Sequence, residues 1–206
     1  MKTSKKLAAA IAVALAAVSC EKSGLGDDSA KDARLQKVNE QFVDEVVVPT
    51  YKSLADECIK LQATLESLTE TKTDALVAQA CKQWKNARQH WEWSEAFLFG
   101  AASQYGIDPH IDTWPLDKVA LDGVLNNDAM MDNIDKYVPN FNGGLLGFHG
   151  LEYIIFREGK ERAASDISDK EVKYAIAVAA DLTVSACHLE AAWAGLDNVT
   201  EEKQTI

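Results

Sequence analysis

The segment Gly147-Phe148-His149-Gly150-Leu151-Glu152 places an imidazole and a carboxylate three positions apart. On a helix, this spacing brings both side chains to adjacent points of one face. Iron and zinc accept such nitrogen and oxygen ligands, but two protein ligands do not hold a metal ion tightly. The motif is equally typical of a core histidine that hydrogen-bonds a glutamate. It therefore predicts a metal site at His149 and Glu152 only if further ligands come from elsewhere.

A second group of acidic residues lies in the segment Asp112-Thr113-Trp114-Pro115-Leu116-Asp117. This segment stands at a predicted boundary between a loop and a helix, where side chains often point into functional sites. Together with Glu95, its carboxylates offer the additional oxygen ligands that a metal would need. We expect Glu95 and Asp112 to be metal ligands and Asp117 to line the site.

Arg88 and Glu95 interrupt an apolar stripe within one predicted helix. The stripe advances by steps of three and four residues, which keeps its members on one helix face: Val77, Cys81, Trp84, Arg88, Trp91, Glu95 and Leu98. A charged side chain in such a stripe either reaches solvent at its edge or faces a polar group inside the protein. The spacing leaves both interpretations open.

Helical periodicity continues through the chain, and the sequence shows no strand pattern. Thr73 caps one long helix, Gly100 closes it, and a loop is expected over 101–113, which has no periodicity. Pro115 suits the first position of a short helix. The predicted helices cover residues 33–48 and 50–68 (two segments, or one helix bent at Pro49), 74–99, 115–126, 128–137, 145–158 and a long stretch after Ser168. The pattern predicts an all-α fold, an up-and-down helical bundle.

The first 19 residues are typical of a secretory signal peptide, with three lysines before an uncharged apolar run too short to span a membrane. The junction Ala17-Val18-Ser19-Cys20 resembles a bacterial lipobox, which predicts lipidation of Cys20; the alternative is an ordinary signal peptide with a nearby cysteine. Residues 20–32 then form the lipidated cysteine and a flexible tether, followed by a helical domain over 33–197 and a tail over 198–206. We expect a bacterial cell-envelope protein that is lipid-anchored to the membrane and is periplasmic or surface-exposed.

Charge and cysteine content narrow the class of protein further. Without the signal peptide, 18 basic residues face 32 acidic ones, a formal charge of −14, which excludes nucleic acid as an expected partner. Cys58, Cys81 and Cys187 each lie in an apolar helical stripe. Because their number is odd and buried free cysteines are common, no disulfide framework is expected.

Several ordered blocks of the sequence resemble the imelysin family, also classed as M75 peptidases. They are Trp84, Ala87-Arg88, Trp91, Ser94 to Gly100, Ile111 to Pro115 and Gly147 to Tyr153. The resemblance implies a cell-envelope protein of two similar helical-bundle halves, linked to iron uptake or regulation. It also implies a site at His149 and Glu152, with Arg88, Glu95, Asp112 and Trp114 facing it, and so favours the buried interpretation of Arg88 and Glu95.

The sequence departs from the family pattern in its length. Family domains are usually much longer, and this chain stops soon after Trp193, about where the first half would end. We therefore expect the chain to resemble the N-terminal half of the imelysin fold. It would be a natural short version, a truncated product, or a half that pairs with another envelope protein supplying the second half.

Three functions are consistent with these residues. The leading hypothesis is a non-catalytic lipoprotein that binds a divalent metal ion, iron or zinc with iron favoured, or an iron-bearing ligand. The alternative is a metal-dependent peptidase with Glu152 as the catalytic group, although Tyr153 stands where the inverse zinc motif H-x-x-E-H has its second histidine. The third is a structural scaffold in which His149 and Glu152 stabilise the core.

Overall fold

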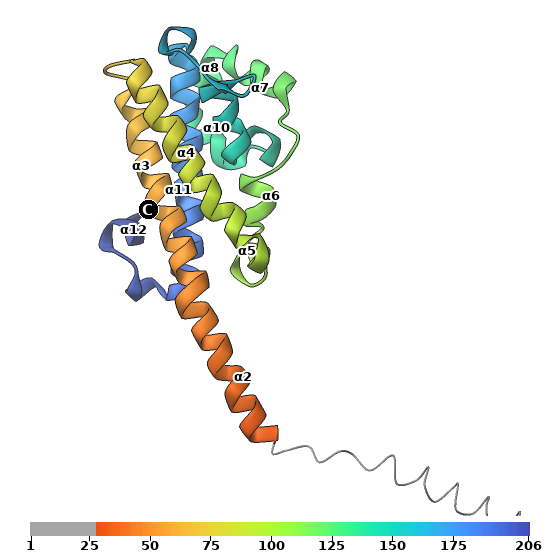
Figure 1. The fold of residues 1–206 in the computed structure, drawn as a ribbon. Helices are drawn as coiled ribbons and strands as arrows, with labels where there is room; N and C mark the ends of the chain where they lie inside the picture. Colours follow the sequence, from red (N-terminus) through yellow and green to blue (C-terminus); the bar gives the residue numbers. More distant parts are fainter. Residues whose placement is uncertain (1–27) are drawn as a thin grey trace, which may run out of the picture. The chain divides into compact units, whose positions relative to one another are not determined.

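Three long helices carry the core of the protein. The computed structural model describes residues 28–206, and in it α3 (Val48–Ser67), α4 (Asp74–Ser94) and α11 (Asp169–Ala194) lie side by side (Figure 1). Contacts divide the chain into two units, Met1–Gln41 and Phe42–Ile206. The three long helices belong to the second unit, and the described part of the first, residues 28–41, lies in the exposed helix α2 (Asp28–Phe42). The predicted helical architecture is confirmed.

Capping and periodicity explain the two helices that the sequence predicts best. Thr73 accepts a hydrogen bond from the Leu76 N–H at the start of α4. Ser168 and Glu171 form a reciprocal capping box at the start of α11. Apolar residues at steps of three and four form the buried face of α11, namely Val172, Ala175, Ala179, Leu182, Ala186 and Leu189, and Trp193 on the same face is partly buried. By length and composition α11 could cross a membrane, but 61% of its most apolar window is buried, as in a core helix.

Shorter elements connect the long helices and cover one side of them (Figure 1). In chain order they are α5 (Ala101–Gln104), α6 (Ile107–Ile111), α7 (Lys118–Leu125), α8 (Asp128–Met131), α9 (Ile134–Tyr137), α10 (Gly147–Ile155), β1 (Phe156–Arg157) and β2 (Lys160–Glu161). Single 3-10 turns lie at Glu95–Phe97, Val138–Asn140, Gly143–Leu145, Ala164–Asp166 and Leu196–Asn198, and α12 (Glu201–Thr205) ends the chain. These short elements position the candidate site described below.

The structure corrects several local predictions. The segment 101–113 is not a loop, because Ile107 and Ile111 are both buried, one turn apart, on α6. The helix expected from Pro115 starts at Lys118, since the Asp117 side chain accepts the Ala120 N–H and caps it there. A two-stranded antiparallel hairpin follows α10.

Both ends of the predicted domain also differ from expectation. Helix α2 begins at Asp28, inside the stretch 20–32 expected to be a flexible tether. The stretch 198–206, expected to be a tail, includes α12, whose Lys203 is only 6% exposed. The signal peptide and the lipidated Cys20 lie outside the described residues.

The irregularity expected at Pro49 lies one turn earlier. Val43–Val47 forms a π-helical turn in which the Val48 N–H donates to the Val43 carbonyl, and Pro49 stands in the first turn of α3. Proline has no N–H to donate, so the regular ladder is interrupted on its N-terminal side.

The three described cysteines are free and buried, as the sequence predicts. Burial raises the pKa of Cys187 to about 11 and that of Cys81 to about 12. These thiols stay protonated and act as small apolar side chains.

Candidate functional site

The backbone at the start of α10 brings the candidate site together. Gly147 has a φ of 62°, and a Cβ atom added there would lie 1.8 Å from the Ile111 carbonyl oxygen. The helix therefore packs backbone to backbone against the end of α6. Asp112 directly follows Ile111, so this contact sets His149 beside Asp112.

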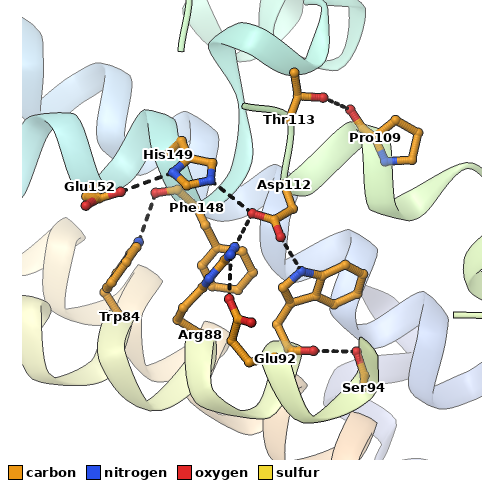
Figure 2. A network of polar contacts seen from close by, with 11 residues as sticks. Trp84, Arg88, Glu92, Ser94, Pro109, Asp112, Thr113, Phe148, His149 and Glu152 are labelled. Atoms are coloured by element: carbon orange, nitrogen blue, oxygen red, sulfur yellow. Dashed lines mark hydrogen bonds and ion pairs between the residues drawn. The ribbon is translucent and has the colours of Figure 1, made fainter. Parts of the chain in front are cut away.

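His149 lies between two carboxylates, one on each ring nitrogen (Figure 2). Its Nε2 is 3.1 Å from Asp112 Oδ1, and its Nδ1 is 3.1 Å from Glu152 Oε2. The side chains of His149 and Asp112 are 16% and 10% exposed, whereas that of Glu152 is 44% exposed. The hydrogen bond to Asp112 raises the pKa of His149, Glu152 raises it further, and burial and Arg88 oppose both. Asp112 thus forms the inner end of the triad and Glu152 the outer end.

Asp112 is held by two further donors from α4. Arg88 Nη1 pairs with its Oδ1 (Figure 2), and Trp91 Nε1 donates to its Oδ2 at 2.8 Å. Burial alone would raise the pKa of this carboxyl group, but the donors, His149 first, outweigh burial and hold the pKa below its usual range. Asp112 is therefore an ionised carboxylate fixed in one orientation.

The structure settles the two interpretations left open for Arg88. Its guanidinium binds Asp112 on the inner side and Glu92 at 2.5 Å, and it lies 5.2 Å from the centre of the Phe148 ring. Arg88 thus faces a polar group inside the protein, as the family resemblance implies. Trp91, which the sequence placed in the apolar stripe and in the family blocks but not in the site, is fully buried and donates to Asp112.

Glu95 belongs to a different group of ligands from His149 and Glu152. It is exposed in the 3-10 turn after α4, so the buried interpretation is wrong for this residue. One oxygen each from Glu95, Asp108 and Asp112 lie within 4.8 Å of one another. Burial raises the pKa of Glu95, and the neighbouring carboxylates raise it further. Sequence reasoning missed Asp108 because its segment was expected to be a loop, whereas on α6 it stands one turn before Asp112.

The four residues predicted as metal ligands thus fall into two groups that share Asp112. His149 and Glu152 extend from it on one side (Figure 2), and the carboxylate of Glu95 groups with it and Asp108. Asp117, predicted to line the site, instead caps α7, and its N–H donates to the Gly144 carbonyl at 2.9 Å.

Trp114 stands at the outer end of the triad and borders a pocket. Its side chain is 71% exposed, and its ring centre lies 4.8 Å from that of His149. The pocket measures about 280 Å³ and is lined by Trp114, Leu116, His149, Glu152, Tyr153, Phe156, Arg157, Glu158 and Gly159. The half-exposed Glu152 and the outer edge of the largely buried His149 therefore border a pocket with aromatic walls.

A second histidine makes an ion pair that the sequence did not indicate. His110 Nε2 on α6 is 2.7 Å from Asp181 Oδ2 on α11. This hydrogen bond raises the pKa of His110 above its usual value, against burial. Because the folded-state pKa is raised, the ion pair stabilises the fold fully below about pH 6.5 and less as pH rises through the folded-state pKa.

We therefore expect His110→Gln to lower the free energy of unfolding by about 1 kcal/mol at pH 5.5, with a smaller loss at pH 8.5. Urea unfolding of both proteins at the two pH values measures the difference. An equal or larger loss at pH 8.5 would contradict a charged pair.

A helical bundle with an Asp-His-Glu triad beside an open pocket defines the structural class of this protein. The chain belongs to the imelysin family, whose profile, peptidase M75, matches residues 47–205. All four residues predicted as metal ligands, and the whole pocket, lie within the matched region.

Several known proteins are similar to this chain. Iron-regulated protein A of Synechococcus elongatus is 32% identical over 152 residues, which are 74% of this chain and 38% of that protein. The crystal structure of an iron-regulated protein A precursor from Parabacteroides distasonis has a TM-score of 0.66 and 29% identity, over 73% of this chain and 42% of that one. An imelysin peptidase from Bacteroides ovatus has a TM-score of 0.57 and 35% identity, over 68% and 42%.

The chain spans about two fifths of the length of these relatives. It is a homologue of iron-regulated protein A, and its fold matches part of imelysin-like structures. Imelysin family proteins are envelope proteins, and the signal peptide at residues 1–19 stays a prediction. Lipidation of Cys20 stays a prediction.

Proposed function

We propose that this protein binds a metal ion, iron before zinc, or an iron-bearing ligand, and that it does so without catalysis at the bacterial envelope. His149 Nδ1 and Glu152 would hold the metal at the mouth of the pocket. The observation that supports this proposal is the 3.1 Å separation of these two ligand atoms, with the other ring nitrogen engaged by Asp112.

The geometry and the chemistry of the donors suit this assignment. Two donor atoms about 3 Å apart can share one ion, because zinc binds nitrogen and oxygen ligands at about 2.0–2.2 Å. When Nε2–H donates to Asp112 and the metal displaces the proton that Nδ1 shares with Glu152, the lone pair of Nδ1 is available for the metal. The exposed side of Glu152 leaves further coordination positions open toward the pocket.

This proposal changes the role predicted for Asp112. Its carboxylate lies on the inner nitrogen of His149 and is held by Arg88 and Trp91, so it orients the imidazole instead of binding the metal. Glu95 and Asp108 add negative charge next to it, which raises the local concentration of cations.

The binding function is better supported than proteolysis. A metallopeptidase needs a metal with an open position and a general base. The three other described histidines have their ring contacts elsewhere, with Trp93 for His90, Asp181 for His110 and Tyr105 for His188. The description of the Bacteroides ovatus relative as a peptidase does not identify a general base or a further metal ligand in this chain.

Metal titration of the purified protein tests the proposal. We expect one Fe(II) per chain under anaerobic conditions, at least tenfold weaker binding for His149→Ala and Glu152→Gln, and about tenfold weaker binding for Asp112→Asn. The matched control is Glu158→Gln, which removes an exposed carboxylate of the same pocket that does not pair with His149.

Calorimetry measures the affinities, and elemental analysis of protein purified without chelators identifies the metal. If the natural protein binds no metal ion, or if His149→Ala and Glu152→Gln bind it as tightly as the natural protein does, the proposal is refuted. If the natural protein binds no metal ion and His149→Ala has a lower melting temperature than the natural protein, the structural scaffold is favoured.

A further inference from the structure

The pocket beside His149 and Glu152, the two proposed metal ligands, has walls suited to a flat apolar group. Trp114, Leu116, Tyr153 and Phe156 form its apolar surface. Phe156 is held in place by edge-to-face packing against Trp84, at 5.5 Å between ring centres. Trp114 exposes 71% of its surface at the pocket edge, although large aromatic side chains are usually buried. An exposed indole beside a pocket is a typical anchor for a bound ring.

A metal ion held by His149 and Glu152 needs further donor atoms. His149 and Glu152 supply two ligand atoms, whereas iron takes more, and hard oxygen donors suit it. The pocket side of the pair is open, so the remaining donors would enter with the ligand.

We infer that the pocket takes an aromatic chelator with adjacent oxygen donors, of the catecholate or hydroxybenzoate class, as its iron complex. This inference rests on the proposed metal function and names its ligand. The oxygens complete the coordination of the metal at His149 and Glu152, and the ring lies against Trp114.

Size and charge support this class of ligand. The volume of about 280 Å³ is at the lower end of small-molecule sites, which suits one or two six-membered rings and is too small to enclose a tetrapyrrole. The guanidinium of Arg157 stacks on the Tyr153 ring at 3.7 Å, and Lys118 lies 5.7 Å from the same ring centre. Arg157 also lies 3.7 Å from Glu171, and Lys118 pairs with Asp122. These two cations offset part of the negative charge of Glu152 and Glu158, so an anionic chelate is repelled less than it would be by the two glutamates alone.

Binding of defined iron complexes tests the inference. The probes are ferric 2,3-dihydroxybenzoate, ferric citrate as a non-aromatic oxygen chelate, and benzoate as a ring without adjacent hydroxyl donors. We expect the natural sequence to bind ferric dihydroxybenzoate at least tenfold more tightly than ferric citrate and not to bind benzoate, measured by calorimetry and by quenching of tryptophan fluorescence.

Substitution of Trp114 isolates the stacking contact. Trp114→Ala should weaken binding of ferric dihydroxybenzoate about tenfold, a larger loss than for free Fe(II), while Trp114→Phe should keep most of the affinity for the chelate. Trp93→Ala is the matched control, because Trp93 is 56% exposed on α4 and does not line the pocket. Melting temperatures verify that the variants fold.

Suppose that the natural protein binds free Fe(II). Equal affinities for ferric citrate and ferric dihydroxybenzoate would then overturn the inference, and so would equal losses of chelate affinity in Trp114→Ala and Trp93→Ala. Failure of the natural sequence to bind either free Fe(II) or any chelate would instead refute the proposed metal function. The two failures are therefore distinguishable.

Discussion

Gly147→Ala should lower the free energy of unfolding by at least about 3 kcal/mol and weaken metal binding at His149. The new methyl group would meet the Ile111 carbonyl oxygen at 1.8 Å and its carbon at 2.3 Å, at a φ of 62° that side chains rarely adopt. Because both obstacles are backbone, no change of rotamer relieves them. The start of α10 must move away from α6, and His149 moves with it relative to Asp112.

Substitutions at two other glycines are controls that separate the cost of a positive φ from the cost of the steric clash. Gly106 has the same φ of 62° with nothing within 4 Å of an added Cβ, so Gly106→Ala should cost about 1 kcal/mol. Gly123 lies within α7 with open space and no unusual φ, so Gly123→Ala should stabilise by about 0.5–1 kcal/mol. Urea unfolding of the three variants, with iron titration of each, measures both effects. A cost for Gly147→Ala no larger than that for Gly106→Ala would show that the close approach is not required.

The long helices could be predicted because their signals are local. Caps at Thr73 and Ser168 and apolar residues every three or four positions define α4 and α11 without knowledge of the rest of the chain. The missed elements are short and have too few residues to show a period. The hairpin, for example, depends on the two-residue turn Glu158-Gly159, in which both residues have positive φ.

The candidate site was predictable to the extent that its residues share one helix. His149 and Glu152 follow from their spacing, and the structure brings their side chains together. The role of Gly147 could not be predicted, because it depends on which backbone of α6 meets α10, and the same contact sets Asp112 as the acceptor for Trp91. The indole N–H of Trp91 gave one signal in advance: a tryptophan in a buried stripe needs an acceptor, and a nearby acid is one.

Lys203→Met should lower the free energy of unfolding by about 3–5 kcal/mol, although the residue lies only three positions before Ile206. Its ammonium is 2.5 Å from Asp56 Oδ1 and 2.6 Å from Glu190 Oε2, and the Lys203 and Glu190 side chains are 3% and 5% exposed. Burial lowers the pKa of Lys203, but the two carboxylates outweigh it and raise the pKa, so the ammonium stays charged. Without Lys203, Glu190 is a buried carboxylate without its cation.

The double variant Lys203→Met with Glu190→Leu tests this explanation. It removes both buried charges, and apolar replacements of a buried ion pair are often neutral or stabilising. Asp56 keeps its pair with Lys52 at 2.6 Å. We therefore expect the double variant to recover most of the stability lost by Lys203→Met, as measured by urea unfolding. If the single variant lies within about 1 kcal/mol of the natural sequence, the lysine is not buried in solution, and α12 does not pack against α3 and α11.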